Sequence, residues 1–170
     1  SSVAIGGQAM TQIATSLITN KQAIYYRVVT GAESNSTVVV TLSGGDTNPS
    51  MMNCLEASGV SSDQSGATGD GDDDASALSH SVGPLTPATA HNLVVKYSGQ
   101  RANRPWTDDA GWTDVGATDQ TWSFGYDIQT AADARTWTSS NVDSNGGQAQ
   151  SMVAFSGNAG GSGCTGGLLL

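Results

Sequence analysis

Short apolar and β-branched runs alternate with polar, glycine-rich breaks along the whole chain. In most runs the apolar positions recur at every second residue, and no segment sustains a 3.6-residue apolar period. A period of two is typical of strands with one buried face. The pattern therefore predicts an all-β protein, an antiparallel β-sandwich of about ten strands. The predicted strands cover residues 9–16, 22–30, 36–42, 51–57, 75–82, 90–98, 111–116, 121–129, 134–140 and 148–156.

The run 36–42 differs from the others because three consecutive valines lie between Thr37 and Thr41. Continuous β-branched residues suit a strand that is buried on both faces or lies near the centre of a sheet. Residues 44–49, with two glycines and a proline, then break the strand. We therefore expect 36–42 to occupy an interior position.

Two stretches of the chain carry the same succession of features. An alternating run, a Thr-rich polar strand, a Gly/Asn turn and a strand closing on Ser-Gly occur within 23–59 and again within 121–157. This repeat predicts a single, internally duplicated sandwich. The expected organisation is one domain of residues 1–157, with halves 1–60 and 75–157 joined by an acidic loop 61–74, followed by a Gly-rich tail 158–170.

The two ends of the sequence lead to further expectations. Residues 3–7 already have the pattern of a strand that runs into a turn, so a sheet edge near residues 3–5 is expected to need a partner. At the other end, three leucines at 168–170 follow the Gly-rich tail. Two interpretations stay open for these leucines: a frayed end, or docking on a neighbouring subunit.

Composition and charge narrow the function classes. A chain of 170 residues can bury a real core, and its apolar fraction of 37% is concentrated in the predicted strands. The formal net charge is -9 and no Lys/Arg cluster is present, so we expect no nucleic-acid binding. No apolar run reaches the roughly eighteen residues of a membrane span and no signal-peptide pattern occurs, so we expect no membrane partner.

Several segments resemble successive strands of a known family. They are residues 3–11, 25–29, 37–41 and 55–60 in the first half, and 86–95, 111–113, 126–130 and 152–155 in the second. These segments are similar to jelly-roll-like β-sandwich domains of phage virion proteins and secreted bacterial surface proteins. The resemblance implies a structural or adhesive role, such as head decoration, a tail or fibre module, or a sugar-contacting domain. It implies no shared catalytic residues. The family usually has another strand or two before the segment at Val3.

The residue pattern itself offers no catalytic centre. Nucleophilic catalysis by serine needs a histidine base that is oriented by a carboxylate. The sequence has two histidines, His80 inside a predicted strand and His91 just before one, and such residues are typically exposed or hydrogen-bonded. No acid/base pair stands out among the scattered carboxylates. We therefore expect a protein that is not an enzyme and has no resident cofactor.

The acidic loop contains the best candidate metal site. Asp70, Asp72 and Asp74 alternate on a Gly-bearing segment, and Ca²⁺ prefers several oxygen ligands in a flexible geometry. The segment is not an EF-hand, because Ala75 stands where the turn glycine is needed and Ser81 where a bidentate Glu is needed. The alternative is a solvated acidic loop that supplies solubility.

A second candidate site lies in the polar stretch 100–110. Trp106 is accompanied there by Arg101, Arg104 and Asp108, and an exposed indole ringed by hydrogen-bonding groups can stack on a sugar or fill a partner's pocket. The alternative is that Trp106 folds back over one end of the sandwich. The first interpretation predicts a ligand-binding or partner-binding loop.

The two cysteines leave two alternatives open. Cys54 lies in the predicted strand 51–57, where a buried free thiol is one interpretation. The other is a disulfide to Cys164 that would pin the tail to the sandwich in an oxidising compartment.

Two function classes agree with these observations. The first is a non-enzymatic structural module of a virion or extracellular assembly, whose partners are other copies of the chain or capsid and tail proteins. The second is a carbohydrate-binding or adhesin module of a secreted or surface protein, for which glycans are the partners. Both place the protein in a virion or outside the cell.

Overall fold

The structure, a computed structural model, describes residues 2–16, 22–29, 37–41, 52–64, 79–87, 90–100, 106–115, 122–141, 148–157 and 167–169. Within these ranges every regular element is a β-strand and all strand pairs are antiparallel, as the sequence pattern predicts. None of these ranges contains a helix long and apolar enough to cross a membrane.

The strands are short, and several are shorter than the sequence pattern predicts. Their bounds are β1 Ser2–Ile5, β2 Gln8–Ala9, β3 Thr11–Ser16, β4 Gln22–Val29, β5 Val38–Thr41, β6 Glu56–Ser58, β7 Val60–Gln64, β8 Ser79–Leu85, β9 Asn92–Gln100, β10 Trp106–Asp108, β11 Thr113–Asp114, β12 Trp122–Gln129, β13 Arg135–Asn141, β14 Gln148–Gly157 and β15 Gly167–Leu169.

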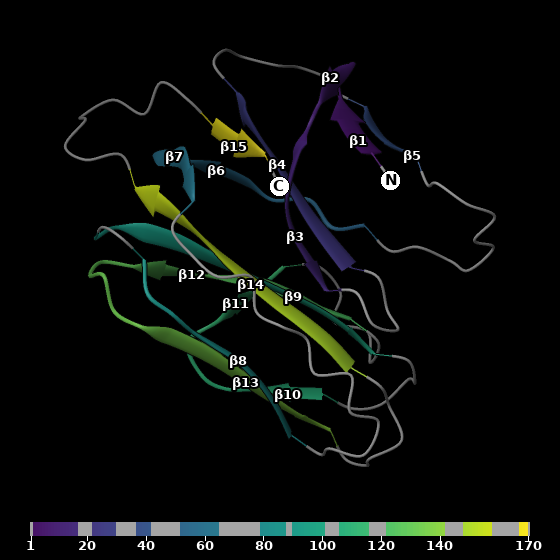
Figure 1. Cartoon of the computed structure of the whole chain (residues 1–170). Helices are drawn as coiled ribbons and strands as arrows, with labels where there is room; N and C mark the ends of the chain where they lie inside the picture. The colour runs from purple at the N-terminus through teal and green to yellow at the C-terminus, as the bar shows by residue number, and fades with distance from the viewer. Residues whose placement is uncertain are drawn as a thin grey trace.

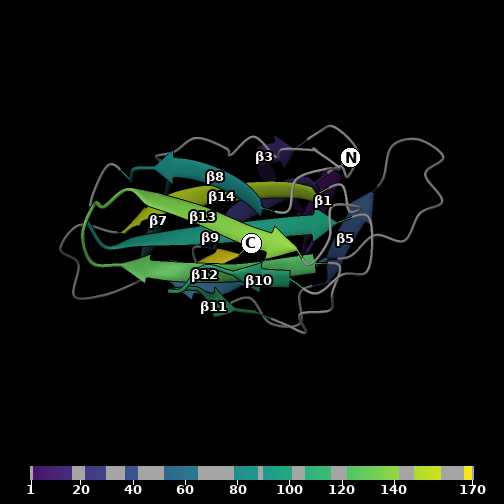
Figure 2. The same cartoon turned by 90° about the horizontal axis from the view of Figure 1, so that it is seen from below.

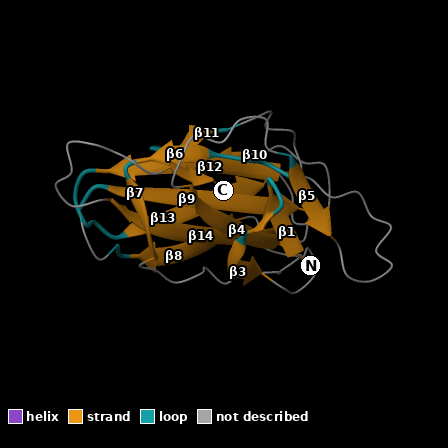
Figure 3. Ribbon diagram, turned by 90° about the horizontal axis from the view of Figure 1, so that it is seen from above, coloured by secondary structure: helices purple, strands orange, loops and turns teal. Residues whose placement is uncertain are grey.

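These strands form sheets that stack in layers (Figure 1). The central sheet has the order β11-β12-β9-β14-β7, the upper sheet β3-β4-β15-β6, and the lower sheet β10-β13-β8. Seen from below, the lower sheet lies in front of the central sheet (Figure 2). A small sheet, β2-β1-β5, lies at one end of the molecule (Figure 3).

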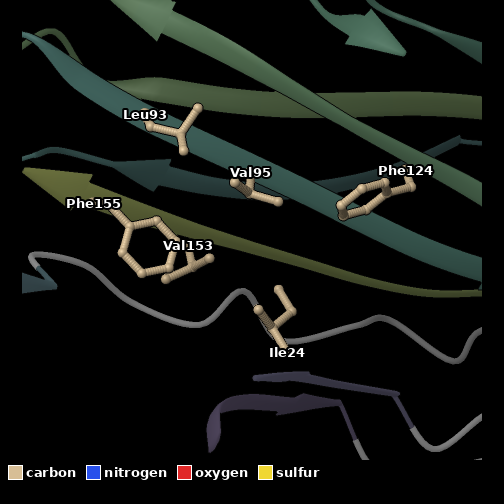
Figure 4. Close-up of a cluster of buried hydrophobic side chains, with 6 residues drawn as sticks. All are labelled: Ile24, Leu93, Val95, Phe124, Val153 and Phe155. Carbon is tan, nitrogen blue, oxygen red and sulfur yellow. The ribbon is translucent and has the colours of Figure 1, made fainter. Parts of the chain in front are cut away.

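The central sheet has buried side chains on both faces, because the upper sheet packs on one face and the lower sheet on the other. Successive side chains of a strand point to opposite faces. On β9, Leu93 and Val95 belong to the core under the upper sheet, whereas Val94 belongs to the core above the lower sheet. This explains why residues 93–95 of β9 and 152–155 of β14 are continuous apolar runs rather than alternating ones. The upper core consists of Ile24, Leu93, Val95, Phe124, Val153 and Phe155 (Figure 4). The lower core consists of Val82, Leu85, Val94, Trp137, Met152 and Ala154.

The expectations for the first half of the sequence need two corrections. Strand β5, expected at a sheet centre or buried on both faces, is the outer strand of the small sheet, with Val39 and Val40 exposed. Strand β1, expected to present an open edge near residues 3–5, pairs with β2 on one side and β5 on the other. The valine run reflects β-propensity rather than burial.

The loop boundaries also differ from the expected ones. Residues 61–64 of the expected acidic loop belong to β7, which pairs with β14 at the edge of the central sheet. The strand predicted at 75–82 extends further along the chain, because β8 runs through the Gly83-Pro84 peptide to Leu85. A proline is tolerated there because β8 is an outer strand of the lower sheet.

Part of the tail differs from the interpretation of a frayed end. Residues 167–169 form β15, which is inserted between β4 and β6 of the upper sheet. Leu168 pairs with Val28 on one side and with Ala57 on the other. Residues 167–169 are therefore not a frayed end, and docking of the leucines on a neighbouring subunit stays a prediction.

Candidate functional site

The lower face of the central sheet carries a buried lysine. Lys96 follows Val94 by two positions on β9, so its side chain points to the same side, and its exposed fraction is 0%. Moving an unpaired ammonium out of water costs several kcal/mol. The fold is therefore stable only if Lys96 has well-placed partners.

The closest partner of Lys96 is Asp108. The Nζ atom of Lys96 donates to Oδ2 of Asp108, whose side chain is only 13% exposed. Lys96 lies in the central sheet and Asp108 ends β10 of the lower sheet. The ion pair thus connects two sheets across their interface.

Asp114 and Ser123 accept the remaining hydrogens of the ammonium group. Oδ1 of Asp114, on β11, lies 3.0 Å from the Lys96 Nζ, and Oγ of Ser123, on β12, lies 3.1 Å from it. An ammonium group has three hydrogens to donate, so all three have an acceptor within the protein. The Ser123 hydroxyl in turn donates to Oδ2 of Asp108 at 2.9 Å.

Tryptophan rings enclose this cluster. The Nε1 group of Trp137, a fully buried side chain on β13, donates to Oδ1 of Asp108 at 2.9 Å. The Lys96 Nζ lies 5.2 Å from the ring centroid of Trp137 and 5.4 Å from that of Trp112. Both distances are within the range of cation–π attraction. We call Lys96, Asp108, Asp114, Ser123 and Trp137 the Lys96 centre.

Gly125 on β12 provides the space for the lysine side chain. Gly125 lies directly opposite Lys96 in the β12–β9 register. A Cβ atom at this position would lie 2.8 Å from Cε of Lys96 and 2.8 Å from the backbone oxygen of Thr113. Such distances are too short for a carbon contact, so the absence of a side chain at 125 allows Lys96 to reach the centre.

A second cation, Arg135, closes the outer side of the cluster. Its guanidinium lies 4.3 Å from the ring centroid of Trp112, the same ring that lies 5.4 Å from the Lys96 Nζ. Its nitrogen atoms lie 3.4 Å from Oδ2 of Asp109 and 3.3 Å from Oδ2 of Asp127. Asp109 also accepts from Nε1 of Trp112 at 3.1 Å, so the same carboxylate contacts the ring and the guanidinium.

Among the residues of the predicted ligand loop, the structure brings Asp108 into the Lys96 centre. Asp108 was expected in a polar loop, but it belongs to strand β10, and both of its carboxylate oxygens bind groups of the protein itself. The side chains of Trp106, Arg101 and Arg104 lie outside the described residues. Binding of a glycan or partner by this loop stays a prediction.

The predicted calcium ligands Asp70, Asp72 and Asp74 also lie outside the described residues. Within the part of the chain that the structure describes, no group of three His, Cys, Asp or Glu side chains is arranged to hold a metal ion. The calcium site therefore stays a prediction.

Cys54 lies in an irregular stretch before β6 rather than in a strand, and its side chain is exposed. The interpretation of a buried thiol was therefore wrong, although partial desolvation still raises the pKa of the Cys54 thiol. Its proposed partner Cys164 lies outside the described residues, so the disulfide stays a prediction.

The two histidines occupy different environments. His80 is buried in β8, whereas His91 is exposed and precedes β9 with a positive φ of 58°. Neither is part of the Lys96 centre.

Sequence reasoning missed Lys96 altogether. The available signal is a single cation within the apolar run of β9, directly after Leu93, Val94 and Val95. A lysine in a strand that is otherwise buried on both faces needs a partner, and that requirement points to carboxylates elsewhere in the chain. The identity of those carboxylates depends on the packing of the two sheets.

No protein-family model, curated protein or solved structure matches this chain.

Proposed function

We propose that the chain is a non-enzymatic structural module of a virion or extracellular assembly, in which neighbouring copies exchange strand β15. The observation that carries the proposal is the place of β15 between β4 and β6. Without β15, the facing edges of β4 and β6 would lose their hydrogen-bonding partner. An unpaired strand edge recruits a strand from another chain.

The sheet orders support the internal duplication that the sequence repeat predicts. In the central sheet, β9 lies between β12 and β14, which carry the second copy of the repeat. In the upper sheet, β15 lies between β4 and β6, which carry the first copy. The middle strand of each copy lies outside these two sheets: β13 belongs to the lower sheet and β5 to the small sheet. Strand β15 thus takes the position in the first half that β9 takes in the second.

The composition of the connection to β15 is compatible with exchange between copies. Residues 158–166 are uncharged and rich in glycine, a composition typical of flexible linkers. The same three residues can form the same backbone ladder in their own chain or in a neighbour. Strand exchange therefore forms an assembly without the need for new contacts.

The Lys96 centre supports a structural role over an enzymatic one. All three ammonium hydrogens of Lys96 have acceptors within the protein, and the side chain is fully buried. These interactions connect strands of two sheets, as expected for a group that stabilises the fold.

The experiment measures the molar mass of the full chain by size-exclusion chromatography with light scattering. We expect oligomers for the full chain and monomers for a Leu168→Pro variant, because proline removes the backbone donor at the centre of the β15 ladder. An Ala159→Pro variant, with the same substitution in the linker sequence, is the matched control and should still form oligomers.

A peptide of residues 158–170 separates assembly from folding. Added to the Leu168→Pro chain, the peptide can pair with β4 and β6 in place of β15 without linking two copies. It should therefore raise the melting temperature of the variant and leave the variant monomeric. A full chain that is monomeric at every concentration, or a Leu168→Pro variant with unchanged oligomers, contradicts the proposal.

A further inference from the structure

The geometry of the Lys96 centre points to a covalent cross-link. We propose that Nζ of Lys96 and Cγ of Asp108 condense to an amide bond that joins β9 of the central sheet to β10 of the lower sheet. The inference stands on the side-chain geometry of this centre alone and does not rest on the proposed function.

The two reacting groups are in contact in a site with little access to water. The Lys96 Nζ donates directly to a carboxylate oxygen of Asp108, and the exposed fractions of the two side chains are 0% and 13%. Holding reactants in contact replaces an encounter in solution by an intramolecular step. Exclusion of water also favours condensation over hydrolysis, because water is the product of one and the reactant of the other.

Each atom that changes in the reaction has a partner for its proton or charge. Asp114, with Oδ1 at 3.0 Å from the Lys96 Nζ, accepts a proton from the amine as the new bond forms. The Nε1 group of Trp137, 2.9 Å from Oδ1 of Asp108, donates to the oxygen on which negative charge develops.

Ser123 serves the departing oxygen. Its hydroxyl lies 3.1 Å from the Lys96 Nζ and donates to Oδ2 of Asp108 at 2.9 Å. It therefore lies between the nitrogen that loses protons and the oxygen that gains them, which is the position of a proton relay. Oδ2 of Asp108 is the oxygen that leaves.

The step balances without another reactant. Proton transfer within the ion pair gives a neutral amine and a carboxylic acid, and the amine lone pair attacks Cγ of Asp108. One C–N bond forms and the bond between Cγ and Oδ2 breaks. The departing oxygen leaves with two protons as water, and the sum of the reaction is ammonium plus carboxylate to amide plus water. No oxidant, reductant or activating group is consumed.

The experiment measures the intact mass of the full chain under denaturing conditions, followed by tandem mass spectrometry of its tryptic peptides. We expect an intact mass lower than the sequence mass by one water molecule. We also expect a peptide in which Lys96 is not cleaved and is joined to the segment that contains Asp108. An intact mass equal to the sequence mass, with normal cleavage after Lys96, overturns the proposal without any variant.

Variants exclude other sources of water loss and test the roles. Lys96→Arg keeps a cation but removes the primary amine, so it should have its full sequence mass. A water loss that persists in Lys96→Arg arises elsewhere, for example by succinimide formation at the Asp70-Gly71 dipeptide, and overturns the assignment. Lys21→Arg, which changes the other lysine, should lose water like the unmodified chain.

The Asp114→Asn variant tests the proton acceptor. Asparagine keeps the shape of the side chain but accepts a proton far less readily, so the cross-link should be absent or should form much more slowly over time. Complete cross-linking of freshly folded Asp114→Asn at the rate of the unmodified chain overturns the role assigned to Asp114.

Discussion

The two faces of the central sheet are stabilised in different ways. The core on the upper face is an apolar cluster of side chains from β4, β9, β12 and β14, whereas the lower face combines an apolar core with the Lys96 centre. Both faces alternate along the same strand, so that Val95 and Lys96 are neighbours in sequence and lie in different cores. The upper face is therefore stabilised by non-directional apolar burial, whereas the Lys96 centre on the lower face needs a defined geometry.

The two interfaces are therefore expected to lose different amounts of stability on substitution. Apolar contacts on the upper face depend on volume and area, and similar side chains can replace one another. In the Lys96 centre the ammonium and the Asp108 carboxylate have defined partners, and the loss of one member leaves a buried charge uncompensated. The upper face therefore contributes stability, and the Lys96 centre additionally fixes the register of the central sheet against the lower one.

The largest difference in the free energy of unfolding is expected between two methionine substitutions on β9, one on each face of the central sheet. Lys96→Met leaves Asp108 buried without its cation and should lower the free energy of unfolding by about 3–5 kcal/mol. Leu93→Met, three positions earlier on the upper face, keeps the volume and should change it by less than about 1.5 kcal/mol. Equilibrium denaturation with urea measures both values.

Equal losses in the two methionine variants would contradict the comparison. They would mean that the buried ion pair is no more sensitive than an apolar contact, as found where a charged pair is replaced by well-packed hydrophobic residues. A double variant that also replaces Asp108 by leucine tests this directly. It should recover part of the loss, because no buried charge then remains unpaired.

The sequence predicts the strands of the second half well. The predicted strands 90–98, 121–129, 134–140 and 148–156 correspond to β9, β12, β13 and β14. In β9, β12 and β14 many of the buried positions are apolar, so local pattern and burial agree. The upper sheet is harder to predict, because β15 follows a Gly-rich segment and its extended form depends on β4 and β6 on its two sides.

The site was less predictable than the fold. Asp108 was a candidate, but its sequence neighbours Trp106 and Arg104 suggested an external ligand, whereas its partner in the structure is Lys96. That contact depends on how β10 of the lower sheet packs against β9 of the central sheet. Sequence periodicity describes which face a residue occupies, but it does not give the alignment between two sheets.

A smaller effect is expected when the space beside Lys96 is filled. Gly125→Ala places a carbon atom 2.8 Å from Cε of Lys96 and from the oxygen of Thr113, and such crowding typically costs about 1–3 kcal/mol. Urea denaturation measures the change.

The same Gly125→Ala substitution in the Lys96→Met background separates the two contacts. Part of the loss should persist, because the Thr113 oxygen belongs to the backbone and remains in place. A Gly125→Ala variant as stable as the unmodified chain would show that position 125 does not determine the path of the lysine.

The smallest effect at neutral pH, and a distinct one at high pH, is expected from Tyr97 on the upper face. Its ring packs 6.0 Å from that of Trp122 and 6.1 Å from that of Phe124, and burial raises the pKa of its phenol above the ordinary value of 10.0. The folded chain therefore keeps the phenol proton at a pH where the unfolded chain loses it. Since the unfolded state then binds fewer protons, the free energy of unfolding falls as the pH rises above about 10.

Tyr97→Phe removes this phenol and retains the ring. At pH 7 the variant should differ little from the unmodified chain, whereas above about pH 10 its free energy of unfolding should fall less steeply, by up to about 1.4 kcal/mol per pH unit. Urea denaturation at a series of alkaline pH values measures the two slopes, and groups that titrate in both chains cancel in the difference. Identical slopes would mean that the Tyr97 phenol ionises as easily in the folded chain as in the unfolded one. The apolar face would then be open to water at Tyr97, and it would be less protected from water there than the Lys96 ammonium is on the lower face.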